Sequence, residues 1–240
     1  MLELQNVSCL VEDESREKEI LKNISFKIDD RFVAITGPNG GGKSTLAKIV
    51  AGIMKPTSGK ILFDGVDITN MSITERANLG ISYAFQQPVR FKGLTVKDLI
   101  KLAAKDRTDT PDICGILSEV GLCAKDYINR EVNASLSGGE LKRIEIAMIL
   151  ARSSKFSIFD EPEAGIDLWS FQSLIRVFEK MYEKTNGEIL IISHQERILN
   201  IADKIIVVAN GEIKDIGPRD RILPELLGTN TTCPALTEKM

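Results

Sequence analysis

The sequence predicts an α/β domain with a mainly parallel sheet that is interrupted by a helical insertion. Short apolar runs alternate with helical segments in the last third of the chain, and strand–helix–strand alternation implies parallel pairing with crossover helices. The middle of the chain, from about residue 92 to 151, has apolar spacing that is mostly helical. Glycine-rich sequence between a buried strand and a helix marks the start of the core.

Hydrophobic alternation predicts two strands near the N-terminus, one in the opening residues and one over Ile20–Ile28. The charged segment between them, Glu12–Glu19, is expected to form a solvated hairpin turn. Phe32–Thr36 is a short apolar run that stops at a glycine cluster, which fits a buried strand. Lys43–Ala51 follows as a helix that Gly52 closes.

Turn chemistry places the remaining elements. Asp64-Gly65 and Asn210-Gly211 each predict a hairpin between two short strands. Thr110 and Pro111 are expected to supply the N-cap and first residue of a helix that runs to about Val120. Three further strands, one helix between the first two of them and a mobile tail complete the prediction: Phe156–Phe159, Glu188–Ile192, Lys204–Val208, the helix Ser170–Lys184 and the tail 229–240.

Composition excludes several classes of protein. The chain has 240 residues, of which 43% are hydrophobic and 27% charged, values that suit a globular domain and not a disordered one. A net charge of −3 disfavours a nucleic-acid partner. No stretch approaches the roughly 18 apolar residues that a membrane span needs, and the N-terminal segment turns acidic, so we expect a cytoplasmic protein. The single histidine excludes mechanisms that need two.

The segment GPNGGGKST matches the phosphate-loop pattern G-x-x-x-x-G-K-[ST] and lies between a predicted strand and a predicted helix. Glycines let backbone N–H groups surround phosphate oxygens, and the helix directs its positive end at them. Lys43 would reach the β- and γ-phosphates, and the Ser44 hydroxyl would bind Mg²⁺. The predicted nucleotide contacts are Gly37, Asn39, Gly40, Gly42, Lys43, Ser44 and Thr45. A chance glycine-rich turn is the alternative, which the strand and helix context disfavours.

Two adjacent carboxylates end the apolar strand in FSIFDE. Asp160 would hold Mg²⁺, through water, beside the phosphate loop. Glu161 would point the other way, as alternate strand residues do, and act as general base toward an attacking water. The alternative is a solvated acidic turn with no catalytic role.

A second helix start carries glycines. Ser137 and Glu140 form a predicted capping box ahead of a helix whose apolar positions are Ile144, Ala147, Met148 and Ala151. A well-capped helix explains this pattern by itself. The two intervening glycines would also leave N–H groups free to bind an anion. Because one phosphate loop already serves the nucleotide, a second such site suggests two chains that share one ATP.

Taken in order, GPNGGGKST, Gln86, LSGGE, FDE, AGID and His194 resemble the motifs of the ATP-binding cassette (ABC) ATPases over nearly the whole chain. The LSGGE signature is highly specific to that family. The resemblance implies a phosphate-loop NTPase core of the ABC type, with an antiparallel β subdomain and a helical insertion. It implies one domain over 1–228, in which 1–91 and 152–228 form the core with the β subdomain and 92–151 forms the helical subdomain.

The resemblance also implies site roles. Two chains would associate head to tail on ATP, with Ser137, Gly138 and Gly139 of one chain contacting the γ-phosphate held by the other. Gln86 would touch Mg²⁺ and link the core to the insertion, and Asp167 would communicate across the dimer. His194 would contact the γ-phosphate, unless it is a strand-end histidine satisfied by backbone. The catalytic residues expected are Glu161, His194 and Gln86, and the metal ligands expected are Ser44, Gln86 and Asp160.

Features of two branches of the family are mixed in this chain. AFQQPV (84–89), HQERIL (194–199) and ELKRIEIA resemble the ATPase of the SUF iron–sulfur cluster assembly system, as does the lack of an aromatic residue over Cys9–Leu21 to stack on adenine. Pro162 and GLTVKDL (93–99) look more like transporter cassettes. We expect an ATP-hydrolysing subunit that drives soluble SUF-type scaffold proteins. The alternative is the ATP-binding subunit of a membrane transporter with a separate permease. A non-catalytic ATP-gated clamp would be expected to lose Glu161 or His194.

Overall fold

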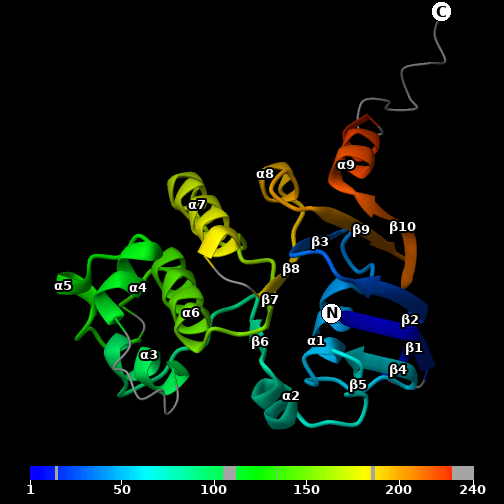
Figure 1. The fold of residues 1–240 in the computed structure, drawn as a ribbon, viewed down its shortest axis with the longest axis horizontal. Coiled ribbons are helices and arrows are strands. Elements are labelled where there is room, and N and C mark those ends of the chain that lie inside the picture. The colour runs from blue at the N-terminus through cyan, green and yellow to red at the C-terminus, as the bar shows by residue number, and fades with distance from the viewer. Residues whose placement is uncertain (14–15, 105–111, 134, 185–186, 229–240) are drawn as a thin grey trace, which may run out of the picture.

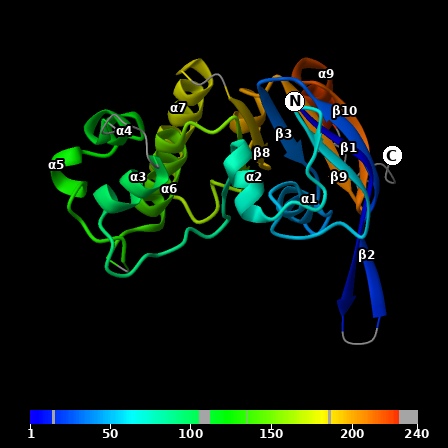
Figure 2. The ribbon, with the colours of Figure 1, turned by 60° about the horizontal axis from the view of Figure 1, so that its bottom comes forward.

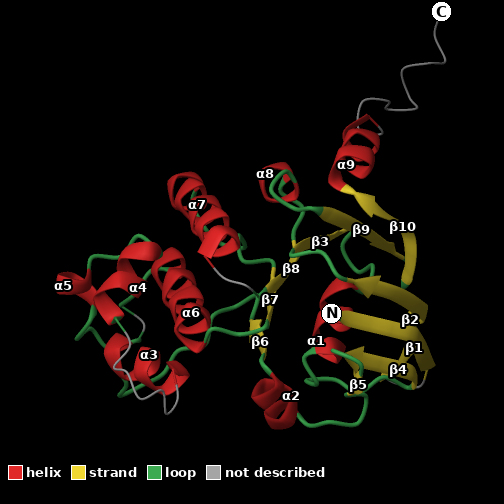
Figure 3. Cartoon of the chain, viewed as in Figure 1, coloured by secondary structure: helices red, strands yellow, loops and turns green. Residues whose placement is uncertain are grey.

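The computed structural model describes residues 1–13, 16–104, 112–133, 135–184 and 187–228 (Figure 1). The strands gather into two sheets on one side of the molecule, and helices α3 to α6 gather on the other (Figure 3). The predicted tail, 229–240, lies outside the described residues.

The larger sheet has six strands in the order β10-β9-β3-β8-β7-β6. Neighbouring strands pair in parallel except β10, which is antiparallel to β9. This confirms the predicted parallel α/β core. The apolar runs are buried because both faces of the sheet are covered. The strands are β3 (Phe32–Thr36), β6 (Ile81–Ala84), β7 (Phe156–Asp160), β8 (Glu188–Ile192), β9 (Lys204–Ala209) and β10 (Glu212–Pro218).

The smaller sheet is antiparallel, in the order β2-β1-β4-β5, and includes the hairpin predicted at Asp64-Gly65. Its strands are β1 (Leu2–Asp13), β2 (Arg16–Ile28), β4 (Ser58–Phe63) and β5 (Val66–Asp67). The hairpin predicted over Glu12–Glu19 is present, but its turn is shorter than predicted, because β1 continues to Asp13 and β2 begins at Arg16, with which Asp13 pairs. The hairpin projects beyond the body of the molecule (Figure 2), where the ladder satisfies its backbone and Glu17 and Lys18 stay in water.

Nine helices lie in the described residues: α1 (Lys43–Val50), α2 (Ile73–Leu79), α3 (Val96–Ala104), α4 (Ile113–Glu119), α5 (Ala124–Tyr127), α6 (Gly138–Arg152), α7 (Leu168–Lys184), α8 (Glu196–Leu199) and α9 (Arg219–Gly228). The N-cap of α4 is Asp112, whose carboxylate accepts a hydrogen bond from the Gly115 N–H at 2.9 Å. Thr110 and Pro111, which were expected to begin this helix, lie outside the described residues.

Two apolar cores meet at the larger sheet. One core joins α1 to both sheets, and the other joins the opposite face of the larger sheet to α3, α4, α6 and α7. Along β7, Phe156 and Ile158 enter the first core while Phe159 enters the second. Because strand side chains alternate, Asp160 shares the face of Phe156 and Ile158 and therefore points toward α1.

A buried arginine ties α1 to α2. Arg76 is 1% exposed, and its guanidinium donates to four backbone carbonyls, those of Ile49, Val50, Thr69 and Met71, at 2.6 to 3.2 Å. Burial lowers the pKa of Arg76, yet an arginine side chain stays charged. One side chain therefore caps α1 and anchors α2.

We predict that Arg76→Met lowers the free energy of unfolding by about 3 kcal/mol or more, because several buried carbonyls would lose their donor. Arg76→Lys should not restore stability, since one ammonium cannot satisfy a planar set of four acceptors. Urea unfolding followed by circular dichroism measures both. Arg221→Met removes a surface arginine paired with Asp215 and should cost far less; equal losses in the two Met variants would contradict the structural role of Arg76.

Candidate nucleotide-binding site

The glycine loop lies between β3 and α1 and closes around the side chain of Lys43. Gly37 has φ 133°, and a Cβ there would lie 2.0 Å from the carbonyl oxygen of Val208, so only glycine fits. Lys43 is 4% exposed, and its ammonium donates to the carbonyls of Gly37 at 2.8 Å and Pro38 at 2.9 Å. The other predicted nucleotide contacts follow the loop: Asn39 and Gly40 are exposed, Gly42 is the N-cap of α1, and Ser44 and Thr45 are half-buried in its first turn.

Asp160 is held between α1 and β6. Its side chain is 2% exposed, and Ser44 Oγ donates to Oδ1 at 2.8 Å, as expected for two predicted metal ligands. The hydroxyl of Tyr83 donates to Oδ2 at 2.7 Å. Burial and this bond to Asp160 raise the pKa of Tyr83. Sequence reasoning missed Tyr83, and the only available signal was a tyrosine in a strand three residues before Gln86.

Glu161 joins Gln86 and His194. Its carboxylate accepts a hydrogen bond from Gln86 Nε2 at 2.6 Å and lies 3.7 Å from His194 Nε2. Strand alternation was expected to set the direction of the Glu161 side chain, but the structure shows a different cause. Glu161 comes after the end of β7 with φ 45°, a left-handed conformation that is costly for a non-glycine residue and is typical of functional sites. The three predicted catalytic residues are therefore close together.

The pKa values of Lys43 and His194 are each set by opposing influences from burial and from neighbouring charges. Burial lowers the pKa of Lys43, while Glu161 and Asp160 act to raise it. Burial and the positive charge of Lys43 lower the pKa of His194, while Glu161 acts to raise it. His194 is consequently neutral near pH 7 and can offer a donor on one ring nitrogen and an acceptor on the other.

The predicted capping box at the start of α6 is present. Ser137 Oγ accepts from the Glu140 N–H at 3.3 Å, and Glu140 Oε2 accepts from the Ser137 N–H at 2.6 Å. Ser137 and Gly138 are exposed, whereas Gly139 is buried. Asp167 is exposed just before α7, and a Cβ on Gly138 would lie 3.5 Å from the carbonyl oxygen of Gly165, two residues earlier in that loop. The signature and the Asp167 loop therefore form one accessible surface.

Lys142 and Glu145 form an ion pair on α6 that hydrogen-bonds to the backbone of Phe85, the residue before Gln86. The Phe85 N–H donates to Glu145 at 2.9 Å, and the Lys142 ammonium donates to the Phe85 carbonyl. Lys142 is 1% exposed and lies 3.3 Å from the Glu145 carboxylate. Burial raises the pKa of Glu145, while Lys142 acts to lower it. Sequence reasoning did not identify this pair, which fixes the Gln86 segment to the helix that begins at Ser137.

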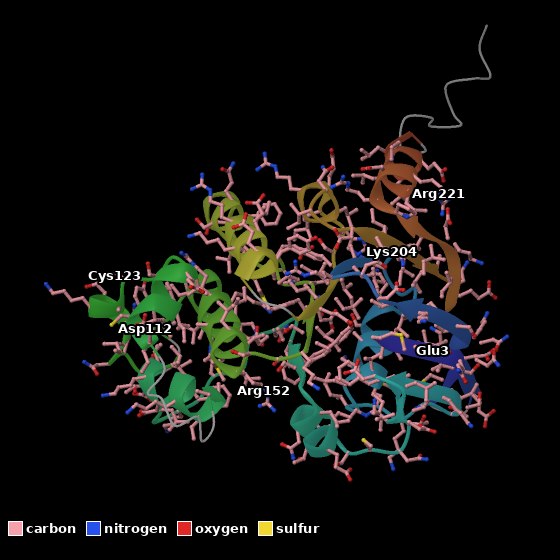
Figure 4. All side chains as sticks on the ribbon, in the orientation of Figure 1. Glu3, Asp112, Cys123, Arg152, Lys204 and Arg221 are labelled. Carbon is pink, nitrogen blue, oxygen red and sulfur yellow. The ribbon has the colours of Figure 1, made fainter. Side chains whose placement is uncertain are left out.

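An apolar groove of about 540 Å³ lies between α2 and β6 on one side and α3 and α6 on the other. Four of its large apolar side chains are exposed, namely Ile73, Phe85, Val89 and Leu102. Tyr83 and Glu145 also line it, so the groove adjoins the Asp160 and Gln86 segments. Arg152, labelled in Figure 4, lies at the end of α6 nearest α2 and donates to the Ala77 carbonyl at 2.6 Å.

The donors around Asp160 fit Mg²⁺ with a nucleotide. Ser44, Asp160 and Gln86 offer hydroxyl, carboxylate and amide oxygens, which are hard ligands. Mg²⁺ is usually held by one or two carboxylates together with substrate phosphates, rather than by a closed cage of side chains. Within the described ranges no group of three or more His, Cys, Asp or Glu forms such a cage. No helix in the same ranges is long and apolar enough to cross a bilayer.

Comparisons with known proteins point to a single family. The family model described as ABC transporter matches residues 21–164. An uncharacterized ABC transporter ATP-binding protein of Methanocaldococcus jannaschii is 41% identical, over 82% of this chain and 82% of its own length. The probable ATP-dependent transporter ycf16 of Trieres chinensis is 33% identical over 92% of both chains. The energy-coupling factor transporter ATP-binding protein of Ureaplasma parvum is 34% identical over 87% of this chain and 72% of its own length.

Solved structures share the fold. A dimeric post-hydrolysis state of an ATP-binding cassette bound to ADP and Pi aligns with a TM-score of 0.81 at 24% identity, over 91% of this chain and 99% of that one. The ADP conformation of a cassette from an ABC transporter aligns with a TM-score of 0.78 at 27% identity, over 96% of both chains. With the glycine loop, the two carboxylates and the signature helix in place, the chain belongs to the ABC transporter family as an ATP-binding cassette protein.

Proposed function

We propose that this chain is the ATP-hydrolysing subunit of a membrane transporter and that it works as a pair of cassettes bound to a separate permease. The observation that carries the catalytic part is the junction of Gln86, Glu161 and His194 beside Lys43 and Asp160. It brings together candidates for a phosphate-binding cation, a metal-binding carboxylate and a general base at one end of the parallel sheet.

Each residue has a separate task in hydrolysis. The glycine loop and Lys43 would bind the β- and γ-phosphates, and Ser44, Asp160 and Gln86 would hold Mg²⁺, whose positive charge would stabilise the charge that develops on the phosphates. Glu161 accepts a proton from the attacking water, and Gln86 orients its carboxylate through the bond from Nε2. Neutral His194 donates a hydrogen bond to the γ-phosphate.

A second copy of the chain completes the site. Ser137 and Gly138 are exposed residues at the start of α6, and a helix N-terminus can bind phosphate oxygens. We propose that Ser137, Gly138 and Gly139 of one chain contact the ATP bound by the other, and that Asp167 lies at the same interface. The dimeric cassette with ADP and Pi supports this arrangement at the level of the fold.

The comparisons favour the transporter over SUF assembly, which was the first expectation from the sequence. The relatives described above are named as transporter ATP-binding proteins or as a transporter. The groove offers exposed apolar side chains between the nucleotide-binding part and the helices α3 to α6, and an amphipathic helix of a permease would bury its apolar face there. Gln86 adjoins this groove through Phe85, so docking and hydrolysis would be coupled.

We predict that Glu161→Gln lowers the ATP turnover rate by about 100-fold or more, because the general base is lost while binding is kept. ATP should then hold the variant as a dimer, which size-exclusion chromatography with light scattering measures. Adding Ser137→Arg in the same background should abolish that dimer and preserve ATP binding, whereas Lys43→Ala should abolish the binding itself. Normal turnover by Glu161→Gln would contradict the assignment of the base.

The transporter assignment is tested by recovering tagged Glu161→Gln with ATP from detergent-solubilised native cells under anaerobic conditions. We expect a protein with several membrane spans, identified by mass spectrometry. Ile73→Asp and Leu102→Asp should lose it because they place charge in the groove, whereas Val66→Asp, exposed on β5, should retain it. A soluble partner that carries iron and sulfide would overturn the transporter proposal in favour of SUF assembly.

His194 is the only histidine in the chain, so its imidazole signals can be followed by NMR without ambiguity. We predict a titration midpoint below 6.5 in the nucleotide-free protein. Lys43→Ala should raise the midpoint because a nearby positive charge is removed, and Glu161→Gln should lower it because a negative charge is removed. A midpoint that does not respond to either substitution would place His194 outside the cluster.

A further inference from the structure

Tyr83 belongs to both the apolar groove and the metal-binding end of β7. Its ring lines the groove, and its hydroxyl donates to Asp160 Oδ2 at 2.7 Å. The register of the sheet sets this reach, because Tyr83 on β6 pairs with Ile158 on β7, two residues before Asp160. Tyr83 is half-buried, whereas Asp160 is 2% exposed.

The two oxygens of Asp160 depend on different donors. Ser44 Oγ donates to Oδ1 at 2.8 Å, and the same Ser44 oxygen is a proposed ligand of Mg²⁺. Tyr83 donates to Oδ2 and is not itself a proposed ligand. A buried carboxylate needs partners to remain in one orientation, and such outer partners of a metal site fix the direction of the ligand. Tyr83 is such an outer partner of Asp160.

The ring of Tyr83 is braced from the groove side. Its centroid lies 5.0 Å from that of Phe85, with the ring planes at 74°, a favourable edge-to-face arrangement. The backbone of Phe85 is in turn held by hydrogen bonds with Lys142 and Glu145 on α6. A displacement of Phe85 would therefore act on the Tyr83 ring, whose other end is bonded to Asp160.

We propose that Tyr83 is a positioning residue that orients Asp160 for Mg²⁺ and thereby joins the groove to the metal site. This inference rests on the proposed function, in which Asp160 holds Mg²⁺. It adds a residue outside the predicted motifs and gives the groove a direct connection to the metal carboxylate, separate from the one through Gln86.

The test is Tyr83→Phe, which keeps the ring in the groove and removes only the hydroxyl. Binding of a fluorescent, non-hydrolysable ATP analogue is measured in EDTA and then over a Mg²⁺ titration, and Mn²⁺ binding is followed in parallel by EPR. We expect unchanged affinity in EDTA and a metal requirement about tenfold higher. Tyr182→Phe is the matched control, because it removes another tyrosine hydroxyl bonded to an aspartate, Asp203, at 3.1 Å; it should behave as wild type.

Further variants separate the possible outcomes. Tyr83→4-aminophenylalanine retains an N–H donor at the same point of the ring and should restore the metal requirement toward the wild-type value. Asp160→Asn should raise the metal requirement further than Tyr83→Phe does. If Asp160→Asn raises it and Tyr83→Phe does not, the role of Tyr83 is overturned and the proposed function stands. If neither variant changes the metal requirement, the assignment of Asp160 as the metal carboxylate fails with it.

Discussion

The site depends on the backbone between two adjacent carboxylates at the end of β7. Asp160 is the last residue of the strand and points toward α1, where Ser44 and Tyr83 hold it. Glu161 leaves the strand in a left-handed conformation and meets Gln86 and His194 instead. A regular strand would have placed the second carboxylate on the opposite face of the sheet. The left-handed residue keeps both carboxylates near Lys43, which the roles proposed for them at the metal and at the attacking water require.

Helix α6 connects three features that lie apart in the sequence. Its first residues form the exposed signature, its second turn grips Phe85 through Lys142 and Glu145, and its last residue, Arg152, lies beside α2. A rigid helix transmits displacement along its length. Movement of the signature surface would therefore reach the groove and Gln86, and in the proposed function this helix would couple dimer closure to the docked permease.

Local chemistry was sufficient to predict most of the elements, and the resemblance to the ABC ATPases indicated the candidate site residues Gln86, Asp167 and His194. The glycine loop, the capping box at Ser137 and the hairpin at Asp64-Gly65 are set by neighbours within a few residues, and all three are present. The turn over Glu12–Glu19 was predicted too long because charge indicates exposure, and an exposed segment can still pair as a strand. Tyr83, Lys142 and Glu145 were not identified from the sequence. Lys142 and Glu145 pair with each other on one helix, but the other partners of these three residues lie 57 or more residues away in the sequence.

The sequence by itself determined the α/β core, the phosphate loop and the family motifs, because these follow from residue types at short and fixed spacing. The tertiary structure decided which residues meet. It placed Gln86, Glu161 and His194 together from three separate segments, directed Asp160 toward both Ser44 and Tyr83, and set Tyr83 into the wall of an apolar groove. These contacts depend on strand order, register and helix packing, which arise from burial of the whole chain and are not encoded in any single stretch of it.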